Sequence, residues 1–138
     1  MKKRGFGRGK WNGVGGKVEP GETLVQAAIR ELDEEIGVKA LPKNLEKVGS
    51  IKFHFPTNSG WNQHMHIFFI KKWSGKPIET DEMSPKWYEK ENLPYESMWV
   101  DDPYWLPNVL AGKKVEGEVH FNNDGTEIKN HSIKEIYK

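Results

Sequence analysis

Residues 16–38 read GKVEPGETLVQAAIRELDEEIGV, and the rest of the sequence is best understood from them. In the second half of this stretch, apolar residues recur at the period of an α-helix, which predicts about four helical turns with one buried face. Thr23 fits the N-cap of this helix, and Gly37 fits a left-handed residue at its C-terminal end. The predicted buried face consists of Val25, Ala28, Ile29, Leu32 and Ile36.

Three carboxylates lie close together beside the buried face. Glu31, Glu34 and Glu35 stand at positions i, i+3 and i+4 of the predicted helix. Each like-charge pair at this spacing costs roughly 0.2–0.5 kcal/mol on an exposed helix, so a counter-charge is needed. A hard divalent cation that takes oxygen ligands supplies one, and we expect Glu22 to face it as a further carboxylate.

A glycine-rich loop precedes the predicted helix. Gly13, Gly15, Gly16 and Gly21 stand where the backbone must turn tightly or approach a ligand closely. The loop leads into the helix N-terminus, whose unpaired N–H groups and dipole favour an anion. A metal beside a diphosphate is the arrangement that metal-assisted cleavage of a phosphoanhydride requires.

The spacing of these residues resembles the Nudix box, G-x5-E-x7-R-E-u-x-E-E-x-G-u, in which u is an aliphatic residue. The sequence satisfies every fixed position of this pattern between residues 16 and 38. A charged helix face is more often a solvated surface, but a complete box outweighs that alternative. The matching residues are Gly16, Glu22, Arg30, Glu31, Leu32, Glu34, Glu35, Gly37 and Val38.

Length and composition restrict the class of protein. A chain of 138 residues predicts one domain, residues 1–138, with a single core. The formal net charge of +1 gives no overall field that would favour a nucleic acid polymer or a membrane surface. There is no cysteine, which suits a reducing compartment, and no apolar run approaches the ~20 residues of a membrane helix. We therefore expect a cytoplasmic monomer, with mitochondria or the nucleus as alternative locations. The resemblance to the Nudix box implies that it binds a small nucleotide.

Alternation at a period of two predicts strands after the box. Ile51, Phe53 and Phe55 alternate with Lys52 and His54, which is typical of a half-buried strand. A second strand is expected to pair with this one. The other predicted segments are a short strand at 11–17, a loop at 39–47, a turn at 56–60, the pairing strand at 63–73 and a short strand at 87–88.

His64 and His66 share one face of the predicted strand at 63–73. A transition-metal pair is one interpretation of two imidazoles at this spacing. Because no third ligand of that type stands nearby, cross-strand packing or a solvated face is the better interpretation.

Two adjacent acids, Asp101 and Asp102, stand among aromatic residues. Buried acids need partners, and a flat hydrogen-bonding ring that stacks on indole could be read by carboxyl groups at its edge. Alternatively, Asp102 is the N-cap of a helix that begins at Pro103 and runs to about Leu110, with Pro107 disturbing its first turns. Both interpretations stay open together, with one aspartate capping and the other reading a base.

The C-terminal part of the chain predicts a β-hairpin. Val115, Val119 and Phe121 alternate with polar residues, the turn falls at residues 123–125, and the returning strand begins at Ile128. Glu118 and His120 are expected on the opposite, solvated face.

Segments outside the box resemble a narrower group, the animal oxidised purine nucleoside triphosphatases of the MutT type. The segments are KKRGFGRGKWNGVGGKVEPGET, DEMSPKWY and MWVDDPYWLP. The resemblance implies an α+β fold, the α-β-α sandwich of Nudix proteins, with a mixed β-sheet between helices.

Members of the group have a hydrophobic strand before the position of Met1, so this first N-terminal strand is expected to be missing from the sequence. We expect a chain with that strand restored to melt at a higher temperature and to have a lower KM, because the strand covers a sheet edge.

The resemblance also implies roles for individual residues, and Arg30 is expected to orient a box glutamate through a salt bridge. Residues that match catalytic positions are Glu34, Glu35, Glu31, Arg30 and Glu82. Metal-binding positions are matched by the Gly15 carbonyl, Glu31, Glu34, Glu35 and Glu82. Substrate-binding positions are matched by Asn12, Asp101 and Asp102 at the base edge, Trp99 on the base face, Phe6, Phe53, Met83 and Trp105 in the pocket wall, and Lys2, Gly16 and Lys17.

The function that the resemblance implies is hydrolysis of oxidised purine nucleoside triphosphates, such as 8-oxo-dGTP and 2-hydroxy-dATP, to monophosphate and pyrophosphate. Such an enzyme uses Mg²⁺, with Mn²⁺ as a substitute, and cleans the nucleotide pool before damaged bases enter DNA. Adjacent aspartates in an apolar pocket are expected to share a proton, which would let the pair both donate and accept hydrogen bonds. Alternatives are a Nudix pyrophosphohydrolase of dinucleoside polyphosphates, nucleotide sugars or methylated purine triphosphates, and a non-catalytic nucleotide-binding module.

Overall fold

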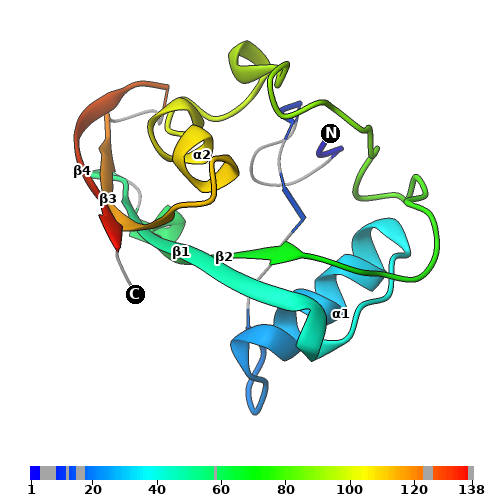
Figure 1. The fold of residues 1–138 in the computed structure, drawn as a ribbon. Coiled ribbons are helices and arrows are strands. Elements are labelled where there is room, and N and C mark those ends of the chain that lie inside the picture. The colour runs from blue at the N-terminus through cyan, green and yellow to red at the C-terminus, as the bar shows by residue number, and fades with distance from the viewer. Residues whose placement is uncertain (4–8, 12, 15–17, 58, 123–125, 137–138) are drawn as a thin grey trace. The chain divides into compact units, whose positions relative to one another are not determined.

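The computed structural model describes residues 1–138 apart from 4–8, 12, 15–17, 58, 123–125 and 137–138. The described chain consists of two compact units. The first comprises Met1–Glu46 and Phe68–Met98, and the second comprises Lys47–Ile67 and Trp99–Lys138. The helix α1 (Leu24–Ile36) belongs to the first unit, and α2 (Asp102–Leu110) belongs to the second (Figure 1).

Both ends of α1 are set by local sequence, as predicted. The Thr23 side chain accepts a hydrogen bond from the Gln26 N–H, while the Gln26 side chain accepts one from the Thr23 N–H. This reciprocal capping box satisfies donors that a helix N-terminus would otherwise leave unpaired. At the other end, Gly37 adopts a φ of 70°, and its N–H donates to the Asp33 carbonyl. A side chain at Gly37 would meet Ile78 at 2.9 Å, so both the conformation and the space favour glycine.

The core of the first unit is built on one face of α1. Leu32 and Ile36 are buried there against Val38 and Met83. Burying a side chain of this size stabilises the fold by roughly 1.5–3 kcal/mol. Of the predicted buried face, Leu32 and Ile36 are fully buried; Val25, Ala28 and Ile29 are half-buried. Ala27 is buried as well, so the packed face is wider than the predicted stripe.

Four strands form one mixed sheet in the order β2-β1-β3-β4. Strands β1 and β3 pair in parallel, whereas β3 and β4 pair antiparallel. This arrangement confirms the α+β class, the pairing of the strand at 63–73 with its predecessor, and the C-terminal hairpin, whose turn lies outside the described residues. The bounds are β1 Leu45–His54, β2 Gln63–Ile70, β3 Lys114–Phe121 and β4 Ile128–Ile136.

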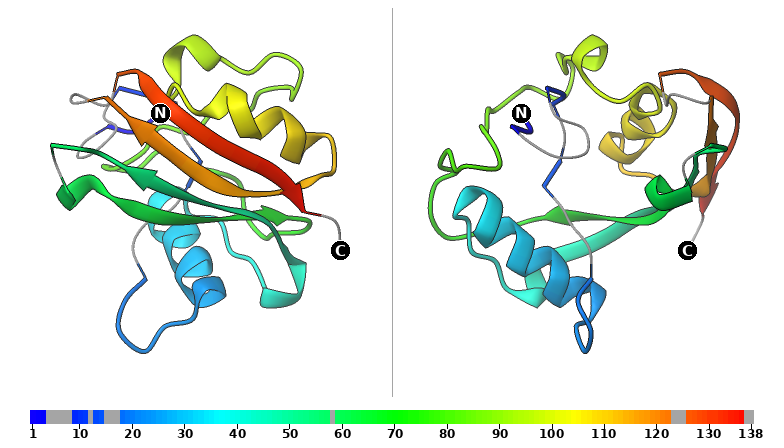
Figure 2. Two further views of the ribbon diagram at one scale, coloured as in Figure 1. Left: turned by 90° about the vertical axis from the view of Figure 1, so that its left-hand side faces the viewer. Right: turned by 180° about the vertical axis from the view of Figure 1, so that it is seen from behind.

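The core of the second unit lies on the α2 side of the sheet. Figure 2 shows α2 lying against β3 and β4. Alternate residues of the strands point into this core, and polar residues between them face the other side of the sheet. The buried residues are Ile51 and Phe53 from β1, Val115, Val119 and Phe121 from β3, and Trp105 and Val109 from α2.

Several predicted boundaries and elements are corrected by the structure. The predicted short strand at 87–88 is wrong, because neither residue is in a strand. Trp87 is 70% exposed, and its ring stacks on that of Trp73 with the centroids 5.8 Å apart. Of the predicted strand at 11–17, the described residues Trp11, Gly13 and Val14 are not in a strand. The expected loop at 39–47 contains a 3-10 turn, Pro42–Asn44, and gives way to β1 at Leu45.

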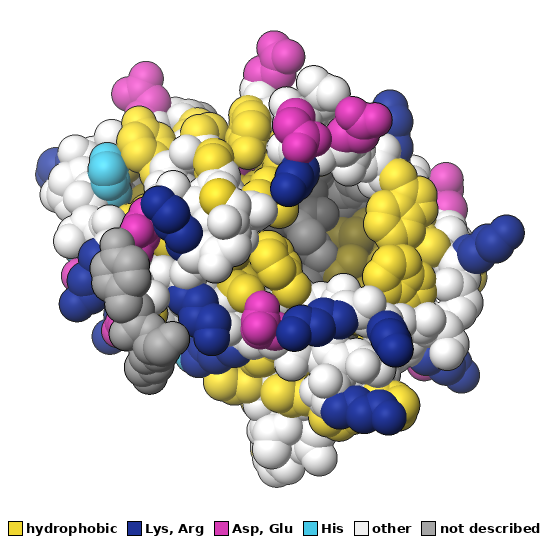
Figure 3. Space-filling view, viewed as in Figure 1, with side chains coloured by type: hydrophobic (Ala, Val, Ile, Leu, Met, Phe, Trp, Pro, Cys, Tyr) yellow, Lys and Arg dark blue, Asp and Glu magenta, His cyan; other side chains and the backbone are white. Residues whose placement is uncertain are grey.

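The surface mixes apolar and charged groups. Large apolar side chains such as Trp73 and Ile78 are exposed in the first unit, and Tyr104 is exposed in the second. Figure 3 shows, on the face it presents, hydrophobic side chains among Lys, Arg, Asp and Glu side chains of both signs. Within the described residues, no helix has the length and apolar character needed to cross a membrane.

Candidate active site

Arg30 is surrounded by carboxylates that come from both ends of the Nudix-box pattern. Its Nε and Nη2 atoms donate to the two oxygens of Glu22 at 2.7 and 3.0 Å, which is a bidentate pair. Its Nη1 atom donates to Glu31 at 2.8 Å and to Glu34 at 3.2 Å. One guanidinium therefore offsets the mutual repulsion of Glu22, Glu31 and Glu34, whereas the sequence suggested a divalent cation as the counter-charge of Glu31, Glu34 and Glu35.

The hydrogen bonds that Arg30 donates shift the pKa of Arg30 and of Glu22. The Arg30 guanidinium holds the pKa of the Glu22 carboxyl below its ordinary value, and the bond from the Glu19 N–H acts in the same direction. The hydrogen bonds that Arg30 donates to Glu22 and Glu31 raise the pKa of Arg30 in turn. Both Glu22 oxygens accept hydrogen bonds from Arg30. In this structure Glu22 therefore binds the arginine, whereas the sequence predicts that it faces a metal.

The three predicted metal ligands of α1 differ in exposure. Glu35 is 2% exposed, the Glu31 side chain 14% and the Glu34 side chain 59%. The helical period explains the order, because Glu35 and Glu31 flank the buried residues Leu32 and Ile36, whereas Glu34 points outward. Glu35 is therefore a buried carboxylate and not a solvated surface charge.

The segment that carries Glu82 is attached to the C-terminal half of α1. The Thr80 hydroxyl donates to the Glu35 carbonyl at 2.7 Å, and it also accepts a hydrogen bond from the Glu82 N–H. Next to Glu82, Met83 packs on α1 in the core of the first unit. Within this unit the fold therefore brings the segment of Glu82, which is far from the box in sequence, to the C-terminal half of α1.

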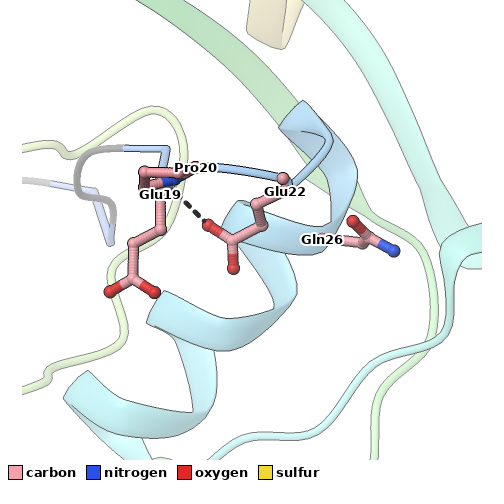
Figure 4. Close-up of a pocket in the computed structure, with 5 residues that line it drawn as sticks. Glu19, Pro20, Glu22 and Gln26 are labelled. Carbon is pink, nitrogen blue, oxygen red and sulfur yellow. Dashed lines mark hydrogen bonds between the residues drawn. The ribbon is translucent and has the colours of Figure 1, made fainter.

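The turn before α1 is narrow and acidic. Glu19 and Glu22 close it through a hydrogen bond from the Glu22 N–H to the Glu19 carbonyl, and Gly21 has a φ of 82°. Pro20 followed by a glycine with positive φ is the preferred sequence for such a turn. Figure 4 shows the Glu19 N–H bonded to the Glu22 carboxylate. Both residues line a surface cavity of about 280 Å³.

Some predicted substrate residues lie outside the described residues, and others occupy core or loop positions. Lys2 forms an isolated bridge with Met83, so this N-terminal segment belongs to the first unit. Met83 is 3% exposed and acts as core there. The predicted residues Phe6, Asn12, Gly15, Gly16 and Lys17 are outside the part of the chain that the structure describes.

Asp101 and Asp102 are buried in the second unit at the start of α2. They are 3% and 7% exposed, and the Trp105 indole N–H donates to Asp101 at 2.8 Å. Helix α2 begins at Asp102, with Asp101 at the N-cap position but without a capping hydrogen bond from its side chain. The prediction that Asp102 caps a helix beginning at Pro103 is therefore corrected by one residue. Pro107 is accommodated within the helix.

Burial makes these two aspartates weaker acids than exposed aspartates. Desolvation raises the pKa of Asp101, although the Trp105 hydrogen bond opposes that rise. Desolvation, together with the neighbouring Asp101 charge, raises the pKa of Asp102 to about 8. At neutral pH, Asp102 is therefore mainly a neutral carboxylic acid that can donate a hydrogen bond. Such a group beside another carboxyl offers both a donor and an acceptor to a ligand.

An aromatic cluster lies in the same unit. Phe55 and Phe121 stack with ring centroids 4.6 Å apart, and Trp99 meets both of them edge-on at 6.5 and 6.1 Å. Phe53 stacks on Phe121 at 5.9 Å. Of the predicted base-binding residues, the structure thus places Trp99 and Phe53 in one aromatic cluster and Trp105 in contact with Asp101.

The oxygen donors of the box suit a hard divalent cation. Glu31, Glu34 and Glu35 offer carboxylates from a single helix, and Arg30 engages one oxygen each of Glu31 and Glu34. Among the described residues, however, the box glutamates do not bring three donor atoms within 4.8 Å of one another. A cation at this position would therefore draw the carboxylates away from Arg30.

The residues that do meet that distance criterion were not singled out by the sequence. The donor atoms of His54, Glu118 and His120 lie within 4.8 Å of one another in the second unit. Alternation placed Glu118 and His120 on one face of a strand. Their meeting with His54 depends on the parallel pairing of β1 with β3, which no local pattern predicts.

Comparison with known proteins identifies relatives along nearly the full chain. The NUDIX domain model matches residues 1–109. The chain is 44% identical to the oxidized purine nucleoside triphosphate hydrolase of Danio rerio and 43% identical to that of Mus musculus. Each alignment covers 99% of this chain and 85% of the relative. A crystal structure of the MutT protein from Bacillus halodurans superposes with a TM-score of 0.82 at 22% identity, covering 96% of this chain and 87% of that one.

Proposed function

The chain belongs to the Nudix hydrolase family, and we propose that it hydrolyses oxidised purine nucleoside triphosphates to the monophosphate and pyrophosphate. The observation that carries this proposal is the identity of 43–44% over 99% of the chain with two animal proteins named for that activity. Because both alignments include α2, they cover the buried aspartates as well as the box. We expect 8-oxo-dGTP and 2-hydroxy-dATP to be substrates.

The residues of α1 support the phosphate chemistry. Nudix enzymes use a divalent metal, and we propose Mg²⁺, held by Glu31, Glu34 and Glu35 with the help of Glu82 and the Gly15 carbonyl. The ion would supply charge neutralisation on the phosphates and a more acidic bound water. Arg30 would hold Glu31 and Glu34 in orientation before an ion binds, because its guanidinium donates to both.

The assignment of the general base follows from the exposure of the carboxylates. Glu34 is exposed, and the contact described for its side chain is an i,i+4 ion pair with Arg30, so it can turn toward a water molecule. Glu35 is buried, and its backbone is fixed by Thr80, so it is better suited to hold a ligand rigidly. We therefore propose Glu35 as a metal ligand and Glu34 or Glu82 as the base.

The second unit supports recognition of an oxidised purine. An added oxo or hydroxyl group changes which atoms along the edge of a purine donate hydrogen bonds and which accept them. The neutral Asp102 can donate a hydrogen bond, and Asp101 can accept one while it is held by the Trp105 indole. The half-buried Trp99 offers an aromatic surface for the base. Discrimination is expected because an unmatched buried carboxyl is left without a partner.

A hydrolysis panel with and without Mg²⁺ tests the proposal. We expect Mg²⁺-dependent release of pyrophosphate from 8-oxo-dGTP, with kcat/KM well above that for dGTP. Equal kcat/KM for the two nucleotides would contradict the substrate assignment, and faster cleavage of a dinucleoside polyphosphate, a nucleotide sugar or a methylated purine triphosphate would replace it. Binding of 8-oxo-dGMP without turnover of any compound would indicate a non-catalytic module.

A further inference from the structure

Two histidines and a glutamate form a cluster on the face of the sheet that points away from α2. His54 of β1 and His120 of β3 are register partners, and their rings stack 4.3 Å apart at 11°. Glu118 lies two residues before His120 on the same face, and its Oε1 is 3.3 Å from the His54 Nε2. The neighbours Phe53 and Val119 point to the buried side, so the proposed nucleotide chemistry uses none of these three groups.

The distances within the cluster match those of a transition-metal site. An ion bound tetrahedrally at roughly 2.0–2.1 Å from each ligand holds its ligand atoms about 3.3 Å apart. The separation of His54 Nε2 from Glu118 Oε1 already has this value, and all three donor atoms lie within 4.8 Å of one another. Small side-chain rotations would be enough to bring the His120 nitrogen into the set.

The cluster is accessible and is mounted on paired strands. The His54 side chain is 37% exposed and the Glu118 side chain is 50% exposed, so an ion can enter without unfolding. Glu118 also lines a surface cavity of about 360 Å³, which leaves room for water as a fourth ligand. Because β1 and β3 are joined by backbone hydrogen bonds, little ordering of the chain opposes binding.

We propose that His54, Glu118 and His120 bind a divalent transition-metal ion of the Zn²⁺ class. Two imidazoles and one carboxylate are a ligand set that Zn²⁺, Ni²⁺ or Cu²⁺ accepts, whereas Mg²⁺ prefers six oxygen ligands in near-ideal octahedral geometry. The site therefore differs in chemistry from the oxygen donors of the box. Glu118 and the nearby Glu116 supply negative charge, and Lys52 and Lys134 on the same cavity oppose it.

Titration of the full chain with Zn²⁺ in the presence of saturating Mg²⁺ tests the proposal, because Mg²⁺ occupies the oxygen ligands first. Calorimetry is expected to show one equivalent of Zn²⁺ bound. The double variant His54→Ala/His120→Ala should weaken this binding by roughly tenfold or more, which is the scale of losses at metal sites. Glu118→Gln should weaken it less, because an amide oxygen still offers a lone pair.

A matched control removes the other neighbouring pair of imidazoles in the same unit. His64 and His66 of β2 also lie with ring centroids 4.3 Å apart. The variant His64→Ala/His66→Ala should bind Zn²⁺ as the unchanged protein does. Loss of binding in this variant alone would overturn the proposal, as would Zn²⁺ binding that survives His54→Ala/His120→Ala or an absence of binding under Mg²⁺.

A measurement on the unchanged protein removes any dependence on how the variants fold. In imidazole NMR spectra, one equivalent of Zn²⁺ should shift the resonances of His54 and His120 and leave those of His131 in place. His131 is a suitable reference because its ring contacts Tyr104 of α2, on the other side of the sheet. Unchanged His54 and His120 resonances would show that the cluster is only an ion pair between protein side chains.

Discussion

Two sets of carboxyl groups lie in opposite electrostatic settings. The first set, at α1 and the turn before it, is Glu22, Glu31, Glu34 and Glu35, and the second set, at the start of α2, is Asp101 and Asp102. Around Arg30, carboxylates are paired with a guanidinium, and the pKa of Glu22 is lowered. At the start of α2, Asp101 and Asp102 are buried with an indole N–H as a neutral partner, and the pKa of each is raised. The comparison teaches that burial and partner decide what a carboxyl can do: the first set holds cations, and the second can donate a hydrogen bond.

The largest expected effect comes from removing a charge in the first set. Glu35→Gln keeps the size of a buried side chain but removes a proposed metal ligand, so kcat should fall by more than the roughly 10–100-fold typical for loss of a group that supports a metal ligand. Steady-state kinetics on 8-oxo-dGTP measures the change. Glu46→Gln is the matched control, because Glu46 lies at the surface of the same unit, where it pairs with the exposed Lys71. A Glu35→Gln variant with unchanged kcat would remove Glu35 from the catalytic set.

Arg30 is expected to have the next largest effect. Arg30→Ala leaves Glu22, Glu31 and Glu34 without their shared guanidinium, so the box carboxylates lose their orientation and kcat should fall by roughly 10–100-fold. Arg30→Lys should recover little, because an ammonium cannot form the bidentate pair with Glu22. Full activity in Arg30→Lys would show that only the charge matters, and the positioning role would then be wrong.

The second set is tested by the dependence of stability on pH. The pKa of Asp102 is raised to about 8 in the folded protein, whereas an unfolded aspartate has a pKa of about 3.9. Between these values the folded state binds more protons, so the free energy of unfolding should decrease as pH rises, by at most about 1.4 kcal/mol per pH unit. Urea unfolding from pH 5 to 9 measures the slope.

Asp102→Asn imitates the neutral carboxyl and should flatten that slope. In the unchanged protein, KM for 8-oxo-dGTP should increase as pH passes about 8, because Asp102 then loses its proton. Asp102→Asn should not show this increase. Asp33→Asn is the control, since Asp33 is an exposed residue of α1. Equal slopes for Asp102→Asn and the unchanged protein would mean that Asp102 is ionised at neutral pH.

The smallest expected effect concerns the helix that carries the first set. Thr23→Ala removes half of the capping box of α1 and should cost about 1 kcal/mol in the free energy of unfolding. Thr23→Ser keeps the hydroxyl and should cost much less. If the two variants unfold alike, the cap contributes nothing and α1 is held by its buried face and by Arg30 alone.

The sequence predicted what depends on local patterns. The cap at Thr23, the left-handed Gly37, the alternation through Ile51 and Phe53, and the C-terminal hairpin follow from periods and propensities that act within a few residues. The family pattern also identified the box and the aspartates of α2. These features need no knowledge of which distant segments meet.

The features that the sequence missed depend on contacts between distant segments. The parallel pairing of β1 with β3 brings His54 to Glu118, and no local signal specifies that register. The bidentate bond between Arg30 and Glu22 required the turn at Pro20 and Gly21 to fold back on α1. Trp87 was assigned to a strand because aromatic residues favour strands, but without a partner strand it remains exposed.

The central claim is that Glu22 and Asp102 hold opposite protonation states at neutral pH, and ¹³C NMR titration of these two carboxyl groups tests it most directly. We predict that the Asp102 carboxyl titrates with a pKa of about 8, while the Glu22 carboxyl titrates below its ordinary value of 4.5. An Asp102 carboxyl that titrates near the ordinary aspartate value of 3.8 would contradict the account, because the second set would then be ionised at neutral pH and could not donate to a base.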